Sequence, residues 1–481
     1  VLTKGPLSRM VPIENASMVD RTVLQWDKDD LDALGLLKVD CLALGMLTAI
    51  RKSLEFIGTR KGYVFEMQDI PAEDTETYDM VCQADTVGVF QIESRAQMSM
   101  LPRLRPRCFY DLVIEVAIVR PGPIQGGMVH PYLRRRSGEE PVDYPNAEVQ
   151  QALGRTLGVP IFQEQVMQLA MLAADFTPGE ADQLRRAMAA WKRKGGLGPF
   201  HQRLVGRMVE KGYDPAYAER IFKQIEGFGE YGFPESHAAS FALLVYVSAW
   251  LKRHHPDAFL AALLNSQPMG FYAPAQLVRD AREHGVQVRP VDVLRSDWHS
   301  TLEDPAAPDD GFGQGRAVLP LHPVPPGLRP VRLGLNRLIG LSEADGQRIV
   351  AARAALAPGE VFASVEDLAR RAQLDAHALQ LLAQGDALRP LVDHRHQAAW
   401  AVRGIDTRAT PLLRATRTHE APADLLPPTA GQALLADYRS TGLSLSAHPL
   451  ALLRSELDAF RVQPAAVLAL CRNGQLARAS G

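Results

Sequence analysis

One short stretch, Leu36 to Leu42, constrains the fold more than any other part of the sequence, because it is apolar except for Lys38 and Asp40. An apolar run of this length is typical of a buried strand. Side chains alternate between the two faces of a strand, so Lys38 and Asp40 point to the same side. Since burying an unpaired charge is costly, the stretch predicts an interior strand on which both side chains have partners.

Two interpretations of this pair are open. In the first, Lys38 and Asp40 neutralise each other inside the core, and the stretch taken alone favours this one, because structural ion pairs also perturb charges. In the second, Asp40 binds a divalent cation and Lys38 faces a phosphate group. The preceding residues, Gln25 to Leu31, predict a turn and a short helix whose first turn carries acids, as the helix dipole favours.

Composition limits the class of protein. A chain of 481 residues is long enough for about three domains. Its 46% hydrophobic and 22% charged residues are typical of a soluble globular protein, and no apolar run approaches the roughly 18 residues of a membrane span. The net charge of −2 does not indicate a nucleic-acid partner, so any such function must show in local clusters. The four scattered cysteines predict reduced thiols in a cytoplasmic protein.

The pattern of helical and breaker residues predicts a mainly α fold with a small α/β part. We expect a partial α/β unit in 1–50, a large helical region in 51–285, short strands and a Pro/Gly-rich loop in 286–332, a second helical region in 333–404, and a linker with one or two C-terminal helices in 405–481. Because the chain opens on valine rather than methionine, we expect it to be a piece of a longer protein.

Basic side chains gather in two segments of the first helical region, with few acids between them. Guanidinium groups suit phosphate, and a basic face holds a polyanion by releasing counterions. The alternative is that these side chains cover solvated helix faces. The first segment contains Arg95, Arg103, Arg105, Arg107, Arg120, Arg134, Arg135 and Arg136, and the second contains Arg185, Arg186, Lys192, Arg193, Lys194, Arg203, Arg207 and Lys211.

Several of these stretches together resemble the bacterial C-family DNA polymerases, which comprise the polymerase III alpha subunit and its error-prone relatives. Gln25 to Leu47 is similar to part of the palm, and five further strings follow the order and spacing of the fingers domain: Gly88 to Arg95, Val119 to Gly122, Phe162 to Met167, Gln183 to Met188 and Phe228 to Leu251. The finer match is to the error-prone branch, in Gln97 to Arg136, Phe233 to Phe241 and Asn265 to Tyr272.

The resemblance implies a role for each matching residue. Asp40 corresponds to the third catalytic carboxylate and would bind Mg²⁺, and Lys38 lies near the incoming triphosphate. Arg185 and Arg186 would contact the nucleotide phosphates, and His237 would lie near the same pocket, although a histidine at a helix start can also be a cap. Arg120 in the Arg-Pro-Gly-Pro segment is implied to contact DNA, whereas Asp27, Asp29 and Asp30 look like solvated acids.

Leu335 to Ile349 resembles a helix-hairpin-helix, whose hairpin amides bind the DNA backbone without reading sequence. Gly340 and Leu341 match the usual Gly-apolar-Gly hairpin, but Ser342 replaces the second glycine, which weakens the expected phosphate binding. A second, weaker copy is centred on Gly385. The alternative is a core of the same shape that does not contact DNA.

Together these features imply an error-prone DNA-directed DNA polymerase used in damage-induced translesion synthesis. Its implied partners are primer-template DNA, deoxynucleoside triphosphates, a polymerase-like accessory protein and the sliding clamp. We expect no membrane partner. The family carries its other two catalytic aspartates on an earlier Asp-x-Asp strand that we do not find here, so we expect this chain alone to be inactive. A non-enzymatic DNA-binding fragment is the main alternative. A hydrolase built on Ser236 and His237 lacks an acid partner at a suitable spacing.

Overall fold

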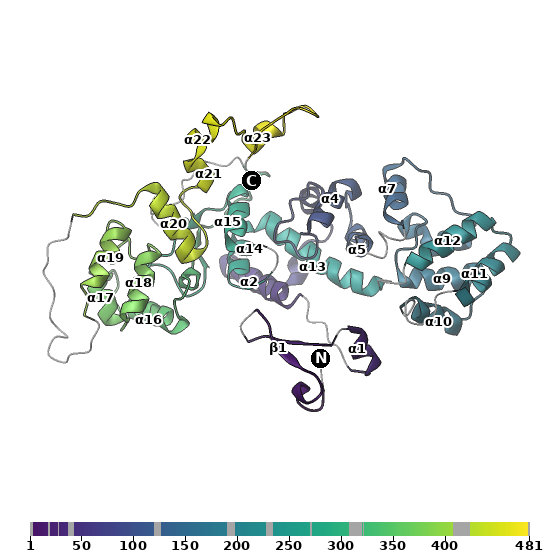
Figure 1. Ribbon diagram of the computed structural model, residues 1–481, viewed down its shortest axis with the longest axis horizontal. Coiled ribbons are helices and arrows are strands. Elements are labelled where there is room, and N and C mark those ends of the chain that lie inside the picture. The colour runs from purple at the N-terminus through teal and green to yellow at the C-terminus, as the bar shows by residue number, and fades with distance from the viewer. Residues whose placement is uncertain are drawn as a thin grey trace.

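The fold of the chain is described from a computed structural model. The structure describes residues 3–17, 20–26, 28–36, 43–119, 127–189, 198–227, 234–269, 272–306, 320, 322–406 and 424–479. Helices dominate this part of the chain, and the strands form two small sheets (Figure 1). The predicted fold class, mainly α with small strand-containing parts, is confirmed.

The N-terminal residues form a small hairpin followed by a short helix. β1 (Ile13–Asn15) pairs antiparallel with β2 (Thr22–Leu24), with Ile13 opposite Leu24. The helix α1 (Lys28–Ala33) follows, so the sequence interpretation that acids lie at the start of a short helix here is confirmed. A single-turn 3-10 helix, η1 (Leu7–Arg9), precedes the hairpin.

The core of the first helical region is built on two long helices, α2 (Leu44–Lys61) and α13 (Glu235–His254). α5 (Phe109–Ile118) packs against α13, and α14 (Pro256–Leu264) packs against α2. Both partner helices are apolar on nearly every face, which is the pattern of a fully buried helix, and all nine residues of α14 are buried. Because α2 is continuous, the boundary expected at residue 50 between the α/β unit and the helical region falls inside a helix.

Shorter helices surround this core, and several begin at an N-cap side chain that accepts a backbone hydrogen bond. Ser94 caps α4, Asn146 caps α8 and Asp74 caps α3 in this way. The surrounding elements are η2 (Met67–Asp69), α3 (Thr75–Cys82), α4 (Arg95–Leu104), α7 (Val129–Ser137), α8 (Ala147–Leu153), η3 (Gly154–Thr156), α9 (Gln163–Ala174), α10 (Pro178–Ala189), α11 (Gly198–Glu210), α12 (Pro215–Gly227) and α15 (Pro274–Glu283).

A three-stranded sheet joins the two helical regions. β3 (Val288–Arg289) lies parallel to the central strand β5 (Val331–Arg332), and β4 (Thr301–Leu302) lies antiparallel to it. Arg289 and Arg332 are buried on neighbouring strands, and both bind Glu303. One carboxylate therefore holds two buried guanidinium groups, which fixes the register of this small sheet.

The second helical region contains η5 (Leu335–Arg337), α16 (Glu343–Ala354), α17 (Val365–Arg371), α18 (Ala376–Gln384) and α19 (Arg395–Arg403). After residue 424 the chain forms α20 (Ala430–Thr441), α21 (Pro449–Leu452), α22 (Arg454–Ala459) and α23 (Ala465–Leu468). The expectation of one or two C-terminal helices was wrong, because Gly442 ends α20 in a left-handed conformation and prolines at 449 and 464 divide the rest.

Candidate nucleotide and nucleic-acid binding site

The arginine pair of α10 lies on a well-capped helix. Thr177 Oγ accepts from the Glu180 backbone N–H at 3.3 Å, and Glu180 in turn accepts from the Thr177 backbone N–H at 2.8 Å. This reciprocal cap fixes the start of the helix, so positions 185 and 186 fall one turn after Asp182. The predicted nucleotide-binding arginines are therefore carried by a rigid element.

Both arginines converge on one carboxylate. Arg185 Nη2 lies 2.8 Å from Asp182 Oδ1, and Arg186 Nε lies 2.8 Å from Asp182 Oδ2. Hydrogen bonds, first of all from Arg185, lower the pKa of Asp182, which keeps it ionised. The two arginine side chains are still 40% and 74% exposed. They form a pair of accessible guanidinium groups whose spacing matches a two-oxygen anion.

His237 lies in the first turn of α13, but Pro234 occupies the N-cap position. The imidazole is half-buried and packs on Phe241, with ring centroids 4.3 Å apart. The start of α13 is held by Glu235, whose carboxylate accepts from Tyr110 Oη at 2.9 Å and pairs with Arg155 at 3.2 Å. The histidine therefore sits at a firmly anchored helix start.

Three predicted site residues, Lys38, Asp40 and Arg120, lie outside the described residues, as does most of the strand expected around Asp40. The structure thus places Arg185, Arg186 and His237, and the predicted catalytic role of Asp40 stays a prediction.

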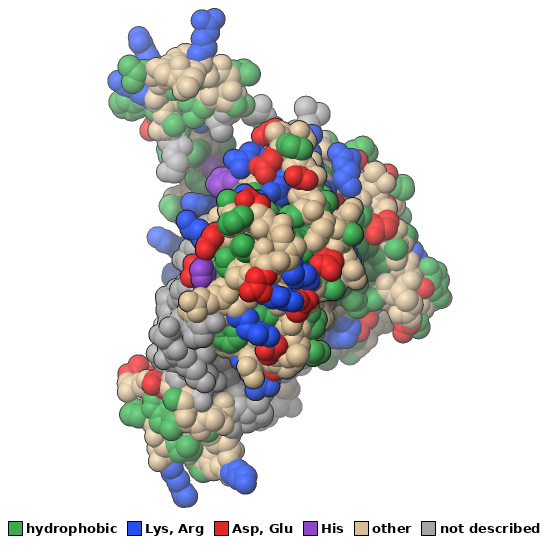
Figure 2. Space-filling model, turned by 90° about the vertical axis from the view of Figure 1, so that its right-hand side faces the viewer, with side chains coloured by type: hydrophobic (Ala, Val, Ile, Leu, Met, Phe, Trp, Pro, Cys, Tyr) green, Lys and Arg blue, Asp and Glu red, His purple; other side chains and the backbone are tan. Residues whose placement is uncertain are grey.

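In the described part of the second basic segment, three basic side chains pair with acids outside their own helix. Figure 2 faces the end of the molecule formed by α10, α11 and α12, where basic and acidic side chains alternate over the surface. Arg207 and Lys211 both bind Asp175, at 2.7 and 3.0 Å, and Arg203 binds Glu180 at 2.7 Å. For these residues, the interpretation as a solvated helix face fits better than a polyanion-binding face.

The first hairpin of the second helical region has features that oppose anion binding. Gly340 has a φ of +90° and Leu341 is buried, but Ser342 is the N-cap of α16, where its hydroxyl accepts from the Asp345 backbone N–H at 3.1 Å. The first turn of α16 carries two acids, Glu343 and Asp345, and negative charge there disfavours a phosphate.

The two copies of the hairpin also pack against each other. A Cβ atom at Gly385 would overlap Leu338 Cδ2, and Leu381 Cδ1 lies 3.5 Å from the Cβ position of Gly340. The Ile339 backbone N–H donates to the Ser440 carbonyl of α20 at 2.8 Å, so α20 takes up one hairpin amide. These contacts favour a structural role for at least part of the motif.

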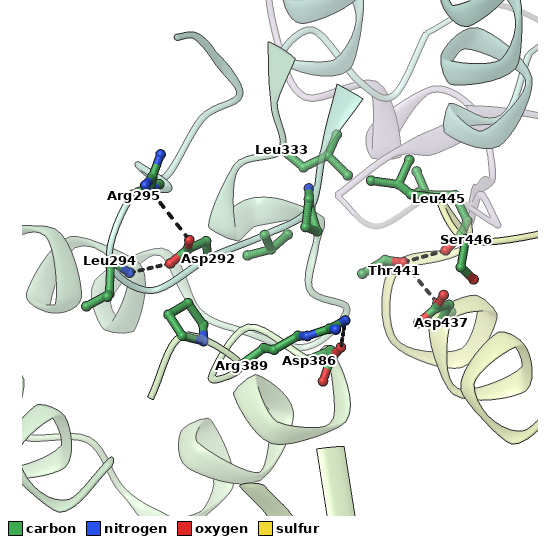
Figure 3. A pocket seen from close by; sticks show the side chains of 15 residues that line it. Asp292, Leu294, Arg295, Leu333, Asp386, Arg389, Asp437, Thr441, Leu445 and Ser446 are labelled. Carbon is green, nitrogen blue, oxygen red and sulfur yellow. Dashed lines mark hydrogen bonds and ion pairs between the residues drawn. The ribbon is translucent and has the colours of Figure 1, made fainter. Parts of the chain in front are cut away.

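Near Gly385 the three-stranded sheet, the second hairpin and the end of α20 enclose a cavity of about 340 Å³ (Figure 3). Asp386 lines it, and burial raises the pKa of this carboxyl group. Asp437 of α20 lies across the cavity and accepts from Arg395 at 2.6 Å. The second hairpin thus presents both a carboxylate, Asp386, and a guanidinium group, Arg389, to this cavity, and such a mixed lining is less suited to a phosphate than a basic one.

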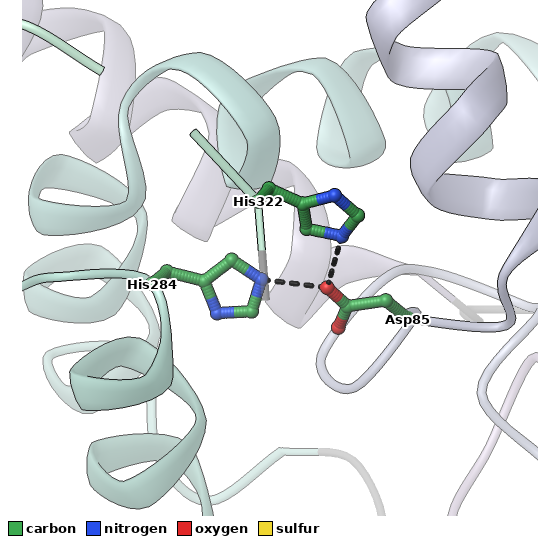
Figure 4. Close-up of side chains that lie close together, drawn as sticks. All are labelled: Asp85, His284 and His322. Carbon is green, nitrogen blue, oxygen red and sulfur yellow. Dashed lines mark hydrogen bonds and ion pairs between the residues drawn. The ribbon is translucent and has the colours of Figure 1, made fainter. Parts of the chain in front are cut away.

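A buried group of two carboxylates, two histidines and a lysine is the best candidate for a metal site among the described residues. Potential ligand atoms of Asp85, His284 and His322 lie within 4.8 Å of one another, and Figure 4 shows both rings pointing at Asp85. The Nε2 atoms of His284 and His322 are 2.7 and 2.9 Å from the same Asp85 oxygen. Ligands of one Zn²⁺ lie roughly 3.3 Å apart, so these distances fit hydrogen bonds better than shared metal coordination.

The protonation states in this group follow from its hydrogen-bond partners. His284 donates from Nδ1 to the Asp280 carbonyl at 2.7 Å and from Nε2 to Asp85, so its ring carries both protons. Lys252, with its Nζ between Asp85 and Asp280 at 2.9 and 2.8 Å, supplies the second positive charge. The two cations balance the two carboxylates, and the network fastens the segment of His322 to α13 and α15. Sequence analysis missed this group, and the i, i+4 spacing of Asp280 and His284 was the only local signal.

Comparison with known proteins shows what these segments are similar to. Residues 46–212 match the bacterial DNA polymerase III alpha subunit finger domain, residues 285–398 match a helix-hairpin-helix motif, and residues 1–43 match the bacterial DNA polymerase III alpha NTPase domain. The whole chain is 58% identical to the error-prone DNA polymerase of Bordetella bronchiseptica. The chain is thus a homologue of part of an error-prone DNA polymerase.

Other error-prone DNA polymerases match over the same extent. Identity is 57% to the enzyme of Methylococcus capsulatus and 56% to that of Pseudomonas aeruginosa, in each case over 100% of this chain. The chain spans 44% of the Bordetella and Pseudomonas proteins and 45% of the Methylococcus protein. Within the described part of the chain, every helix is too short or too polar to span a membrane.

Proposed function

We propose that this chain is part of an error-prone DNA-directed DNA polymerase that adds deoxynucleotides to a primer 3′ end during damage-induced translesion synthesis. The observation that carries the proposal is identity of 56 to 58% to error-prone DNA polymerases over the full length of the chain. Primer extension on undamaged and lesion-bearing templates by the complete polymerase tests it. Loss of extension on the damaged templates alone would contradict the translesion role.

In this proposal Arg185 and Arg186 bind the triphosphate of the incoming nucleotide. Their exposure and their convergence on Asp182 support this role, because a phosphate can replace the carboxylate between two guanidinium groups. A charged hydrogen bond to phosphate is worth roughly 1.5 to 3 kcal/mol. His237, on the anchored first turn of α13, is proposed to lie beside the same nucleotide.

By resemblance, Asp40 would hold the divalent cation, which we propose to be Mg²⁺, and Lys38 would approach the triphosphate. A carboxylate oxygen is a donor that this hard cation prefers, and the bound ion would offset negative charge on the phosphates. Arg120 is proposed to contact the DNA. The sliding clamp and a polymerase-like accessory protein are proposed partners of the complete enzyme, for which we assign no residues.

A second candidate function is DNA binding without catalysis by this chain alone. The two described N-terminal strands, β1 and β2, carry no aspartate, and exposed arginines remain on the helical region. A primer-extension assay on the 481-residue chain and on a version extended upstream separates the two candidates. We expect DNA binding by both and extension by the longer protein alone; extension by the shorter chain would refute this second candidate.

A further inference from the structure

A groove of about 770 Å³ lies between the end of α4 and the helix α7, and its lining is strongly basic. Of the described residues that line it, Glu139 is the one acid, beside His130 and six arginines: Arg103, Arg105, Arg107, Arg134, Arg135 and Arg136. The arginines come from two separate segments of the chain, and the fold brings them to one groove.

Local structure explains how these arginines meet. α4 ends at Leu104, Arg105 takes a left-handed conformation with a φ of +50°, and Pro106 prevents the helix from continuing. Arg136 then joins the two walls: it binds Asp111 through both Nη atoms, at 2.7 and 2.6 Å, and donates to the Leu104 carbonyl at 2.6 Å. The groove is therefore held in shape by buried contacts and does not depend on a ligand.

The charges in the groove are not balanced. Asp111 pairs with Arg136, and Glu140 pairs with both Arg134 and Arg135. Arg103, Arg105 and Arg107 are exposed and form no ion pair with any described residue. Even when Glu139 is counted with Asp111 and Glu140, six arginines face three carboxylates. The positive potential that remains favours an anion, and its size and spread favour one with several charges.

The lining indicates which polyanion fits. Among the described residues that line the groove none is aromatic, so they offer bases no stacking platform. Of its leucines, 104 and 133 are buried and Leu157 is only partly exposed, so the described lining offers little apolar surface for the anchor residue of an acidic peptide. What the groove offers is guanidinium groups along two walls, and these suit successive phosphates of one nucleic-acid strand.

We propose that this groove binds a single strand of DNA through its phosphates, at a site separate from the arginine pair of α10. The proposal rests on the function proposed above, because a DNA polymerase meets single-stranded template. Figure 1 shows α4 and α7 on the upper side of the molecule and α10 on the lower side. Contacts limited to phosphates make the binding independent of base sequence.

The test compares the 481-residue chain with a variant in which Arg103, Arg105 and Arg107 are changed to Gln. The three side chains are exposed, so the fold is expected to persist, and circular dichroism checks it. A matched control changes three other exposed arginines to Gln: Arg51, Arg279 and Arg439. Fluorescence anisotropy with a labelled oligothymidylate measures affinity across a range of salt concentrations.

Losing three phosphate contacts should reduce the slope of log K against log salt by about 2, and it should weaken binding at low salt on the order of tenfold. The control variant should keep the parent slope. Equal salt slopes in the groove variant and the control variant would overturn the proposal. Binding of a polyglutamate peptide is measured as well: a groove variant that loses peptide binding but keeps oligonucleotide binding would also overturn it. Hydrogen exchange on the parent chain gives a second readout, since the oligonucleotide should protect residues 102–108 and 130–137.

A second experiment distinguishes failure of the proposed function from failure of this inference. Arg185→Gln with Arg186→Gln in the complete polymerase should weaken nucleotide binding and leave the oligothymidylate slope unchanged. The groove variant should keep nucleotide binding and show a smaller salt slope for the oligothymidylate. A groove variant that loses nucleotide binding as strongly as oligonucleotide binding would refute two separate sites.

Discussion

Asp85→Asn should destabilise the region around α15, because Asp85 accepts from three donors in the interior. His284 Nε2 and His322 Nε2 share one carboxylate oxygen at 2.7 and 2.9 Å, and Lys252 Nζ lies 2.9 Å from the other. An asparagine at this position keeps one acceptor oxygen and turns an N–H₂ group toward a donor. The doubly protonated His284 would then lose its counterion.

The expected cost follows from burial. Lys252 is 1% exposed and keeps two contacts after the change, with Asp280 at 2.8 Å and with the Val87 carbonyl at 3.2 Å. Removing one partner of a buried ion pair costs about 3 to 5 kcal/mol, and the surviving contacts of Lys252 place the expected loss near the lower end, at about 3 kcal/mol. The double variant with His284→Gln should lose less than the sum of the two single changes.

The pH dependence of stability gives a second signature. Burial opposes protonation of His284, but the hydrogen bond to Asp85 and the negative charges of Asp85 and Asp280 together outweigh it and raise the pKa of the ring. Its contribution is therefore complete below the unfolded pKa of about 6.5 and is lost as pH rises through the higher folded value. Burial also opposes ionisation of Asp85, yet its hydrogen bond with His284 and the charge of Lys252 hold its pKa well below the usual range. That contribution is lost only as pH falls toward the depressed value.

Urea unfolding of the full chain, with hydrogen exchange to localise the effect, measures both signatures. The exposed pair of Asp458 with Arg454, 3.5 Å apart, supplies the control, and Asp458→Asn should change stability by less than about 0.5 kcal/mol. A loss below about 1 kcal/mol in Asp85→Asn, or an unchanged pH dependence above pH 6.5, would refute a charge-balanced network.

Three further changes test other parts of the molecule. Arg185→Ala or Arg186→Ala in the complete polymerase should raise the KM for nucleotide more than the Kd for DNA, and an unchanged KM in both would refute their assignment. Asp40→Asn should abolish primer extension while melting temperature and DNA binding stay nearly intact; an unstable enzyme whose activity follows the folded fraction would instead indicate a structural ion pair. Gly385→Ala should lower the melting temperature, because the new Cβ overlaps Leu338, and an unchanged melting temperature would argue against close packing of the two hairpins.

Sequence by itself determined the features that depend on neighbouring residues. The reciprocal cap of Thr177 and Glu180, the short helix after Gln25 and the apolar helix before Lys252 all follow from local signals. The motif strings of the helical region likewise led to the polymerase family, which the comparisons then supported. The number of C-terminal helices was missed because single glycines and prolines divided a helical pattern.

Only the tertiary structure decided which charges are paired. Arg207 and Asp175 are 32 residues apart, and Asp85 lies 199 residues from His284 and 237 from His322, so no local pattern relates them. The two basic segments look alike in sequence, yet folding pairs Arg203, Arg207 and Lys211 of one with Glu180 and Asp175, whereas Arg103, Arg105 and Arg107 of the other form no ion pair with any described residue. The physical reason is that helix signals act over a few residues, whereas the energy of a charge depends on every group that folding brings within a few ångströms.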